Sequence, residues 1–385
     1  MTSRIKISSA FDGGNISVIE ASEPDNIRVK IPNDTNSKFL QWFYFRLQGG
    51  MGESCVIQFE NANDAAYPDG WVDYQAVASY DREYWFRVPT EYVDGKLVIN
   101  HQPEQDSVYY AYFAPYSYER HLDMMAWAAS NEDCITHHLG ETAEGRDITM
   151  LEISKTQGLA KNIWITARQH PGETMAEWFI EGLLERLFDE SHPVSRALLE
   201  KCRFYVVPNM NPDGAVHGNL RVNSKGVNLN REWKKPTKEF SPEVLAVQTK
   251  MAETGVDMFL DIHGDEALPV NFVDGCQGVP SFDARMESME TLFKDMFLAV
   301  SPDFQTEIGY EPDQFGEANL TVATKWVGET YRCLALTLEM PFKDNQNLPD
   351  EMVGWSPERA KILGADVLYP VYHVLNSKYM QVDSE

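Results

Sequence analysis

Hydrophobic and polar positions follow two different patterns along the chain, and the change lies near residue 110. Before it, apolar side chains occur in short, aromatic-rich segments that are separated by turn residues. Short alternating segments rich in aromatic and β-branched residues are typical of strands that bury one face. The first part is therefore predicted to form an antiparallel β-sandwich. Its predicted strands cover residues 39–47, 55–59, 76–80, 84–89, 96–99 and 107–113.

The second pattern consists of amphipathic stretches that alternate with short apolar runs. The amphipathic stretches cover residues 118–130, 174–188, 242–254 and 283–300, and the apolar runs cover 163–167, 203–207, 257–262 and 333–338. Helices that alternate with buried strands predict an α/β fold, in which helices cover a mixed central sheet. We predict a β-sandwich domain over residues 1–112 and an α/β/α domain over residues 113–385.

Residue types that bind metals follow the apolar runs. His170 and Glu173 follow the first run, 208–214 follows the second, His263 the third and Glu339 the fourth. A His and a Glu three residues apart can direct one nitrogen and one oxygen to a single point, which suits zinc. Each motif alone has an ordinary explanation, such as a solvated pair or a core histidine. Four polar sites at four strand ends favour a metallohydrolase, because ligands bind beyond the carboxyl ends of such strands.

Composition narrows the class of protein further. The 33 basic and 59 acidic residues give a net charge of −26, which repels nucleic acid and anionic membranes. No run of 18 apolar residues and no secretory signal are visible, so we expect no membrane association. The five cysteines are scattered and never form CxxC pairs, which predicts reduced thiols in a cytoplasmic protein. The sequence carries no signal for an oligomeric state.

Six motifs together resemble those of the M14 family of zinc carboxypeptidases, in particular the cytosolic carboxypeptidase branch. They are HPGE at 170–173, NPDG at 211–214, GNLR at 218–221, GVNLNR at 226–231, DIHG at 261–264 and TLE at 337–339. Residues 140–148 resemble the opening strand motif of that family, and residues 113–118 resemble the segment that joins its two domains. The resemblance covers residues 110–385 by motif. It implies that residues 113–385 form the carboxypeptidase domain.

The resemblance also implies a role for each matching residue. His170, Glu173 and His263 would bind one zinc ion per chain, and Glu339 would be the general base that acts on a zinc-activated water. Arg221 would polarise the scissile carbonyl and stabilise the oxyanion. Asn230 and Arg231 would hold the terminal carboxylate of the substrate, since a guanidinium matches a carboxylate with two hydrogen bonds. The implied activity is hydrolysis of the C-terminal peptide bond of peptides or proteins.

The sequence departs from the family at one position and leaves two others open. Asn228 stands where the family usually has an Asp that orients a zinc-binding histidine, and an uncharged partner predicts weaker metal binding. Tyr310 is the candidate for the tyrosine that caps the substrate. Lys325, or alternatively Arg332, is the candidate for recognition of an acidic C-terminal side chain.

Two other functions fit part of the pattern. A zinc amidohydrolase of the aspartoacylase or desuccinylase type, acting on N-acyl amino acids, shares the HxxE motif, a distant His and a catalytic Glu. The aromatic β-domain and the complete run from 211 to 231 favour the carboxypeptidase. A non-catalytic peptide-binding module is the third reading, and the intact set of predicted catalytic residues argues against it.

Overall fold

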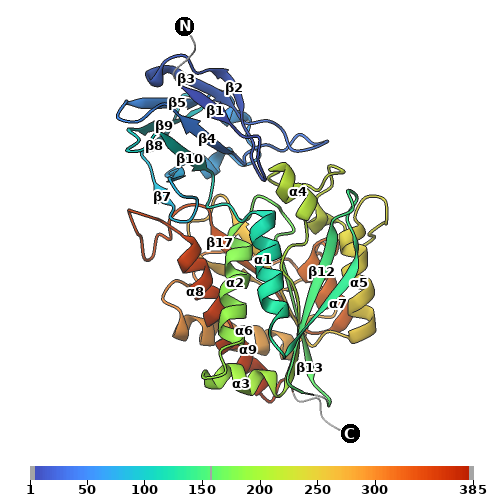
Figure 1. Cartoon of the computed structure of the whole chain (residues 1–385). Helices are drawn as coiled ribbons and strands as arrows, with labels where there is room; N and C mark the ends of the chain where they lie inside the picture. The colour runs from blue at the N-terminus through green and yellow to red at the C-terminus, as the bar shows by residue number, and fades with distance from the viewer. Residues whose placement is uncertain (1–4, 157, 381–385) are drawn as a thin grey trace.

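The computed structural model describes residues 5–156 and 158–380, and its two parts are stacked end to end (Figure 1). The N-terminal part, drawn in blue and blue-green, contains the strands β1 to β10, and the larger part contains the labelled α-helices. No helix in the described part of the chain has the length and apolar character that spanning a bilayer requires.

The N-terminal part is built from two sheets, each of five strands among the described residues. The first sheet has the order β1 (Lys6–Ser8), β4 (Tyr44–Gln48), β10 (Ser107–Ala111), β6 (Val77–Ser79) and β7 (Phe86–Arg87). The second has the order β2 (Ser17–Glu20), β3 (Ile27–Lys30), β5 (Cys55–Phe59), β9 (Lys96–His101) and β8 (Thr90–Val93). The predicted two-sheet β-domain is confirmed, but β3 pairs with β5 in parallel, so the second sheet is mixed.

Aromatic side chains from the two sheets meet between them. The ring centroids of Phe45 on β4 and Phe59 on β5 are 6.2 Å apart, and Phe43 lies 4.7 Å from Phe59. Along β5 buried and half-buried residues alternate, as expected for a strand with one face on the core. The strand predicted at 39–47 begins only at Tyr44. Residues 40–43 are buried and belong to the connecting segment before it.

The larger part contains one sheet of seven strands in the described residues. Its order is β11 (Cys134–Glu141), β12 (Asp147–Ile153), β14 (Cys202–Val207), β13 (Lys161–Ala167), β15 (Met258–Asp265), β17 (Leu334–Pro341) and β16 (Phe272–Asp274). The four predicted apolar runs form β13, β14, β15 and β17, which are parallel to one another, whereas β11, β12 and β16 pair antiparallel. The predicted mixed sheet is confirmed.

Helices cover both faces of this sheet. Figure 1 shows α1, α2 and α8 on one side and α5 and α7 on the other. The four amphipathic stretches form α1 (Tyr118–Ala129), α2 (Met175–Leu187), α5 (Pro242–Thr254) and α6 (Ala284–Val300). The shorter helices were not predicted: α3 (Pro193–Leu199), α4 (Pro212–His217), α7 (Ala323–Tyr331), α8 (Pro357–Asp366) and α9 (Leu368–Leu375). Single 3-10 turns form η1 (Pro24–Asn26), η2 (Ala62–Asp64), η3 (Pro68–Trp71) and η4 (Leu229–Arg231).

The N-terminal part packs on the end of the sheet where the parallel strands terminate. Phe342, directly after β17, stacks on Tyr112 with ring centroids 4.4 Å apart. Arg87 of β7 forms an ion pair of 3.3 Å with Asp344 in the following loop. The backbone N–H of Gly13 donates to the carbonyl of Val216 at the end of α4. This end of the sheet is therefore enclosed by the N-terminal part.

The helix that follows the HPGE loop is fixed by a close backbone contact. At Gly182 of α2 an added Cβ would lie 2.0 Å from the carbonyl oxygen of Lys361 on α8. We predict that Gly182→Ala forces the two helices apart and lowers the free energy of unfolding by about 1–3 kcal/mol, as overpacking typically does. Denaturant unfolding measures this change. Gly158→Ala is the control, since its nearest neighbour would be Thr156 Oγ1 at 3.9 Å. Equal losses in both variants would contradict the prediction.

Candidate metal centre and substrate cavity

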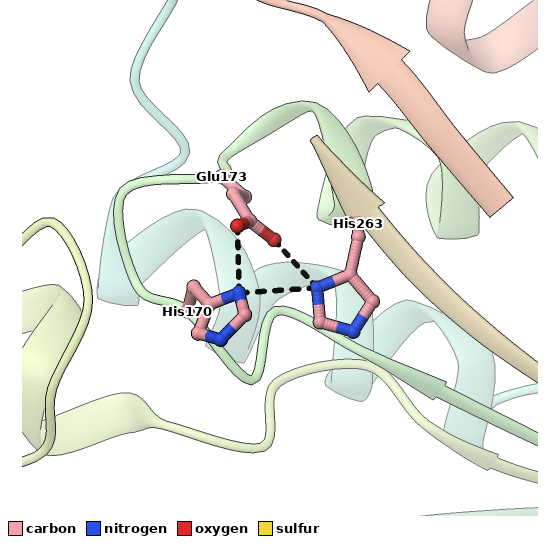
Figure 2. A group of neighbouring side chains, drawn as sticks. All are labelled: His170, Glu173 and His263. Atoms are coloured by element: carbon pink, nitrogen blue, oxygen red, sulfur yellow. Dashed lines mark hydrogen bonds and ion pairs between the residues drawn. The ribbon is translucent and has the colours of Figure 1, made fainter. Parts of the chain in front are cut away.

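Three metal-binding side chains converge at the carboxyl end of the sheet (Figure 2). His170 and Glu173 come from the loop between β13 and α2, and His263 comes from β15. Nδ1 of His170 lies 2.6 Å from Glu173 Oε1, Nδ1 of His263 lies 2.7 Å from Glu173 Oε2, and the two Nδ1 atoms are 3.2 Å apart. All three residues are buried. Among the described residues, this is the one group of three or more His, Cys, Asp or Glu side chains arranged to hold a metal ion.

The loop that carries two of these residues is held from both sides. Arg168 has a left-handed backbone with φ of 56°, and its buried Nε donates to the carbonyl of Pro171 at 2.9 Å. The same guanidinium forms an ion pair with Glu177 on α2. Gly172 donates its backbone N–H to the carbonyl of Leu220 at 2.9 Å, and a Cβ at this position would lie 3.0 Å from Leu220 Cα. The loop therefore has little freedom to move its ligands.

The hydrogen bonds on the far side of each imidazole fit a metal site. Nε2 of His170 lies 3.1 Å from Asn228 Oδ1, and Nε2 of His263 lies 2.8 Å from Asp261 Oδ2. Because both partners are acceptors, each Nε2 can carry a proton, which leaves each Nδ1 available to a metal. Burial lowers the pKa of His263, but the carboxylates of Asp261 and Glu173 raise it well above its usual range, so without a metal a proton on Nδ1 bonds to Glu173. Binding of a metal ion would displace that proton. A set of two His and one Glu suits zinc with one position left open.

Burial also favours the neutral form of the His170 imidazole. The apolar surroundings of His170, together with the nearby Arg221 guanidinium, lower the pKa of its imidazole to about 4. A neutral imidazole is the form that binds a metal. His170 is therefore in the form that binds a metal throughout the neutral pH range.

A cavity of about 360 Å³ opens beside the triad. All six residues predicted to act in catalysis or substrate binding line it, together with His170 and Glu173. The six are Arg221, Asn230, Arg231, Tyr310, Lys325 and Glu339. A larger cavity of about 700 Å³ lies between β11 and α5 and contains none of the predicted residues. The candidate active site is therefore the smaller cavity, because the predicted site residues meet there.

Glu339 lies beside His263 because of strand register. The parallel pairing of β15 and β17 places the two residues directly opposite each other. Both residues lie inside their strands and not after them, because the strands run further than the apolar pattern predicts. Oε2 of Glu339 is buried without a hydrogen-bond partner in the described structure. Burial raises the pKa of this carboxyl well above its usual range, and the carboxylates of Glu173, Asp265 and Glu266 raise it further.

Two cationic groups and one amide group also line the cavity. Nη1 of Arg221 is 3.7 Å from Glu173 Oε1, so the guanidinium borders the metal centre. Asn230 lies in η4, where its Oδ1 accepts from the backbone N–H of Ala323 at 2.8 Å and its NH2 group lies 3.4 Å from Nε2 of His263. Nη1 of Arg231 donates to the carbonyl of Asn230 at 2.7 Å. Burial and the positive charge of Arg221 lower the pKa of Arg231.

Tyr310 and Lys325, which belong to none of the six motifs, both have defined partners. The Tyr310 hydroxyl lies 2.6 Å from Asp265 Oδ2 and 3.4 Å from Glu339 Oε1. The Lys325 ammonium donates to the carbonyl of Gly275 at 2.7 Å and pairs with Asp274 and Asp313 at 3.1 and 3.2 Å.

Arg332, the alternative to Lys325, ends α7 and is not among the residues that line the cavity.

Sequence reasoning missed several residues of the cavity. Asp265 and Glu266 directly follow the DIHG motif, so their proximity in sequence to His263 was an available signal. Tyr67 comes from the N-terminal part, whose sequence shows no cluster of titratable groups. Its ring centroid lies 5.3 Å from Cζ of Arg221. No local pattern connects two residues so far apart in the chain.

Comparison with known proteins identifies the family. Residues 121–361 match the zinc carboxypeptidase family, and residues 7–113 match the N-terminal domain of cytosolic carboxypeptidases. The chain belongs to the M14 family of zinc carboxypeptidases. It is thus a metallo-carboxypeptidase, and His170, Glu173 and His263 are consistent with its single zinc site. The match favours this function over the N-acyl amidohydrolase and the non-catalytic module.

Relatives of this carboxypeptidase cover most of the chain. An uncharacterized protein of Zymomonas mobilis is 47% identical over 94% of the chain and 95% of its own length. Cytosolic carboxypeptidase 6 of Mus musculus is 28% identical over 69% of the chain, and the match spans 54% of the mouse protein.

Solved structures show the same fold. A metallo-carboxypeptidase from Burkholderia cenocepacia is 50% identical with a TM-score of 0.95, covering 97% of this chain and 99% of that one. A metallo-carboxypeptidase from Pseudomonas aeruginosa, in complex with (2-guanidinoethylmercapto)succinic acid, is 46% identical with a TM-score of 0.94 and covers 98% and 100% of the two chains.

The outer partners of the two histidines provide a test of zinc affinity. We predict that Asn228→Asp strengthens zinc binding about 10-fold, because a charged acceptor makes the His170 imidazole more basic. Asp261→Asn removes that charge from the His263 pair and weakens binding about 10- to 100-fold. Competition with a chromogenic chelator measures both. Each variant is the control for the other, and shifts of the same sign in both would contradict the assignment.

Proposed function

We propose that this carboxypeptidase removes residues from the free C-terminus of peptides or proteins, with Glu339 as general base and Arg221 as the oxyanion-stabilising group. The observation that carries the proposal is the sharing of one cavity by the metal centre, Glu339 and the cations Arg221 and Arg231. A metal site, a proton acceptor and two cations in one cavity are the groups that hydrolysis of a C-terminal peptide bond would use.

Glu339 has the surroundings of a proton-transfer group. A zinc ion held by the triad would supply Lewis acidity and lower the pKa of a water molecule toward neutrality. In its ionised form Glu339 would take a proton from that water and return it to the leaving amine nitrogen, and a raised pKa makes it a stronger base than an ordinary carboxylate. The free Oε2 atom is the acceptor for this proton, since no other group in the described structure occupies it.

Arg221 is placed to act on the developing charge. Its guanidinium is largely buried, and its Nε has no hydrogen-bond partner in the described residues. A fixed cation in a site of low dielectric stabilises an oxyanion far more than one in water. Arg221 therefore polarises the scissile carbonyl and holds the negative charge that forms on its oxygen.

The Asn230–Arg231 pair supports action at the chain end. The pKa of Arg231 is lowered because its guanidinium is buried near a second cation, so this side of the cavity is electrostatically suited to an anion. The substrate's terminal carboxylate supplies that anion, and a planar guanidinium binds it with two hydrogen bonds. The NH2 group of Asn230 adds a third donor.

Glu339→Gln tests the proton-transfer step. We predict that kcat falls about 100- to 10,000-fold, the usual contribution of a general base, while zinc content stays at one per chain. Release of the last residue from a peptide, followed by mass spectrometry, measures the rate. Arg231→Ala serves as the matched variant for binding: it should raise KM and change kcat little. Near-full activity of Glu339→Gln would contradict the assignment.

A preference for acidic C-terminal residues is the finer part of the proposal. Lys325 lies in the cavity wall and is the basic group that an acidic side chain would meet. Its ammonium is already paired with Asp274 and Asp313. Asp313 belongs to an exposed loop, whereas Asp274 lies in β16, so Asp313 is the partner that an acidic side chain would replace.

Paired peptides ending in Glu and in Leu test this preference. We predict that Lys325→Met lowers the Glu-to-Leu ratio of kcat/KM about tenfold, the effect of one charge-assisted hydrogen bond. Asp313→Asn should raise the same ratio, because it frees the ammonium. Unchanged ratios in both variants would show that Lys325 has no part in specificity.

Two observations support a cytoplasmic location. The N-terminal domain is of the type found in cytosolic carboxypeptidases. All five cysteines are free and buried.

A further inference from the structure

The segment that carries Arg221 has no regular secondary structure. It follows α4, which ends at Gly218 in a left-handed conformation with φ of 68°, and it leads into η4. A side chain on a strand or helix is positioned by the backbone hydrogen bonds of that element. Arg221 has no such support, so its position depends on contacts with other parts of the molecule.

Asp34 of the N-terminal domain supplies the missing backbone contacts. Its Oδ1 accepts from the N–H of Leu220 at 2.7 Å, and its Oδ2 accepts from the N–H groups of Arg221 and Val222 at 2.7 and 3.3 Å. Three successive amides that point at one buried carboxylate form a compact anion-binding turn. The backbone of Asp34 is itself held, because its N–H donates to the carbonyl of Phe39 at 2.7 Å.

The residues after Asp34 extend the same contact. Thr35 donates from its N–H and its hydroxyl to Asn219 Oδ1, at 3.0 and 3.1 Å. Asn36 donates from Nδ2 to the carbonyl of Ser224 at 3.0 Å. Residues 34–36 thus clamp the Arg221 segment on both sides of Arg221.

The other face of this segment contacts the metal-binding loop. The carbonyl of Leu220 accepts from the N–H of Gly172, which lies between His170 and Glu173. The peptide group joining Leu220 to Arg221 is therefore hydrogen-bonded to Asp34 through its N–H and to Gly172 through its carbonyl. A loss of Asp34 would release Arg221 relative to the metal centre.

Tyr67 contacts the guanidinium end of Arg221. Its ring lies 5.3 Å from Cζ of Arg221, within the range of a cation–π contact. Gln41, which is fully buried, fixes the backbone of Tyr67 by accepting from its N–H at 2.9 Å and donating to its carbonyl at 3.1 Å. The N-terminal domain therefore contacts both the backbone and the guanidinium of Arg221.

We propose that the N-terminal domain is an integral part of the catalytic site, with Asp34 as the positioning residue for Arg221 and Tyr67 as the wall against which its guanidinium rests. This inference rests on the role of Arg221 in the proposed function. It gives the N-terminal domain a catalytic purpose beyond packing.

The Asp34 carboxylate is buried at a cost in solvation. Burial raises the pKa of Asp34 from 3.8 to about 6, although three backbone N–H groups and Arg221 lower it. A carboxyl with a folded-state pKa above its unfolded value favours folding when protonated, and that contribution is lost as the pH rises through 6. At neutral pH the fold is therefore less stable with Asp34 ionised than with Asp34 protonated, although the carboxylate accepts three backbone hydrogen bonds.

A double-mutant cycle in the full-length zinc-loaded enzyme tests the proposal. Asp34→Ala and Asp34→Asn are each made alone and with Arg221→Ala, and kcat, KM, zinc content and melting temperature are measured. We expect Asp34→Ala to lower kcat about 100-fold, as for a catalytic group misplaced by about 1 Å, with one zinc retained. Asp34→Asn should lower kcat less, because one carbonyl acceptor remains. In the Arg221→Ala background, Asp34→Ala should change kcat less than about twofold.

Thr90→Val is the matched control within the N-terminal domain. The Thr90 hydroxyl accepts from the N–H of Ala76 and donates to the carbonyl of Val88, and these bonds lie wholly inside that domain. This variant should lower the melting temperature and leave kcat unchanged.

Three results would overturn the inference. An equal loss of kcat from Asp34→Ala with and without Arg221 would show that Asp34 acts through the general fold. If Asp34→Ala is fully active while Arg221→Ala is inactive, the positioning role of Asp34 is rejected. The proposed function is then unaffected. Near-full activity of Arg221→Ala would reject the proposed role of Arg221, and the inference with it. Should Asp34→Ala fail to fold, Asp34→Asn carries the same cycle.

Discussion

Three electron-pair donors face one buried point, and the rest of the site depends on that arrangement. Nδ1 of His170, Nδ1 of His263 and the carboxylate of Glu173 lie within 4.8 Å of one another. A cation must lie between them, either a proton or a metal ion, because three donors so close together would otherwise repel one another. Asp261 and Asn228 offer acceptors to the outer nitrogens, so that both Nδ1 atoms can bind a metal. A divalent cation fits this centre, because it can bind the two imidazole nitrogens and the carboxylate together.

The sheet and the N-terminal domain then place the groups proposed to react around that centre. Parallel register brings Glu339 level with His263, and the β13–α2 loop carries the other two ligands at the same edge. Arg221 comes from an irregular segment, which lacks the support of a sheet. The N-terminal domain contacts this segment through Asp34 and Tyr67. The geometry of the proposed site thus depends on both a sheet and a domain contact.

The sequence predicted the parts of the site that depend on local pattern. The four central strands and the four long helices have clear periodicity, and the HPGE and DIHG motifs supplied the three metal-binding residues directly. The short strands β1, β2, β3, β8 and β16 were missed, because three or four residues carry too little alternation. The longer strands β11 and β12 were also missed, and β11 is mostly polar and exposed. The parallel β3–β5 pairing could not be predicted, since register between distant strands depends on tertiary packing. The same limit applies to Asp34, to Tyr67 and to the two aspartates that pair with Lys325, because these contacts join residues far apart in the chain.

The central claim is that two imidazoles and one carboxylate bind a zinc ion at the end of the sheet, and X-ray absorption at the zinc edge tests it most directly. For protein loaded with one zinc per chain, the account predicts two imidazole nitrogens at about 2.0–2.1 Å and carboxylate oxygen at about 2.0–2.2 Å. It predicts no sulfur, since all five cysteines are buried and free, and none belongs to the metal-binding group. A sulfur shell at about 2.3 Å, or a first shell without two imidazoles, would contradict the account.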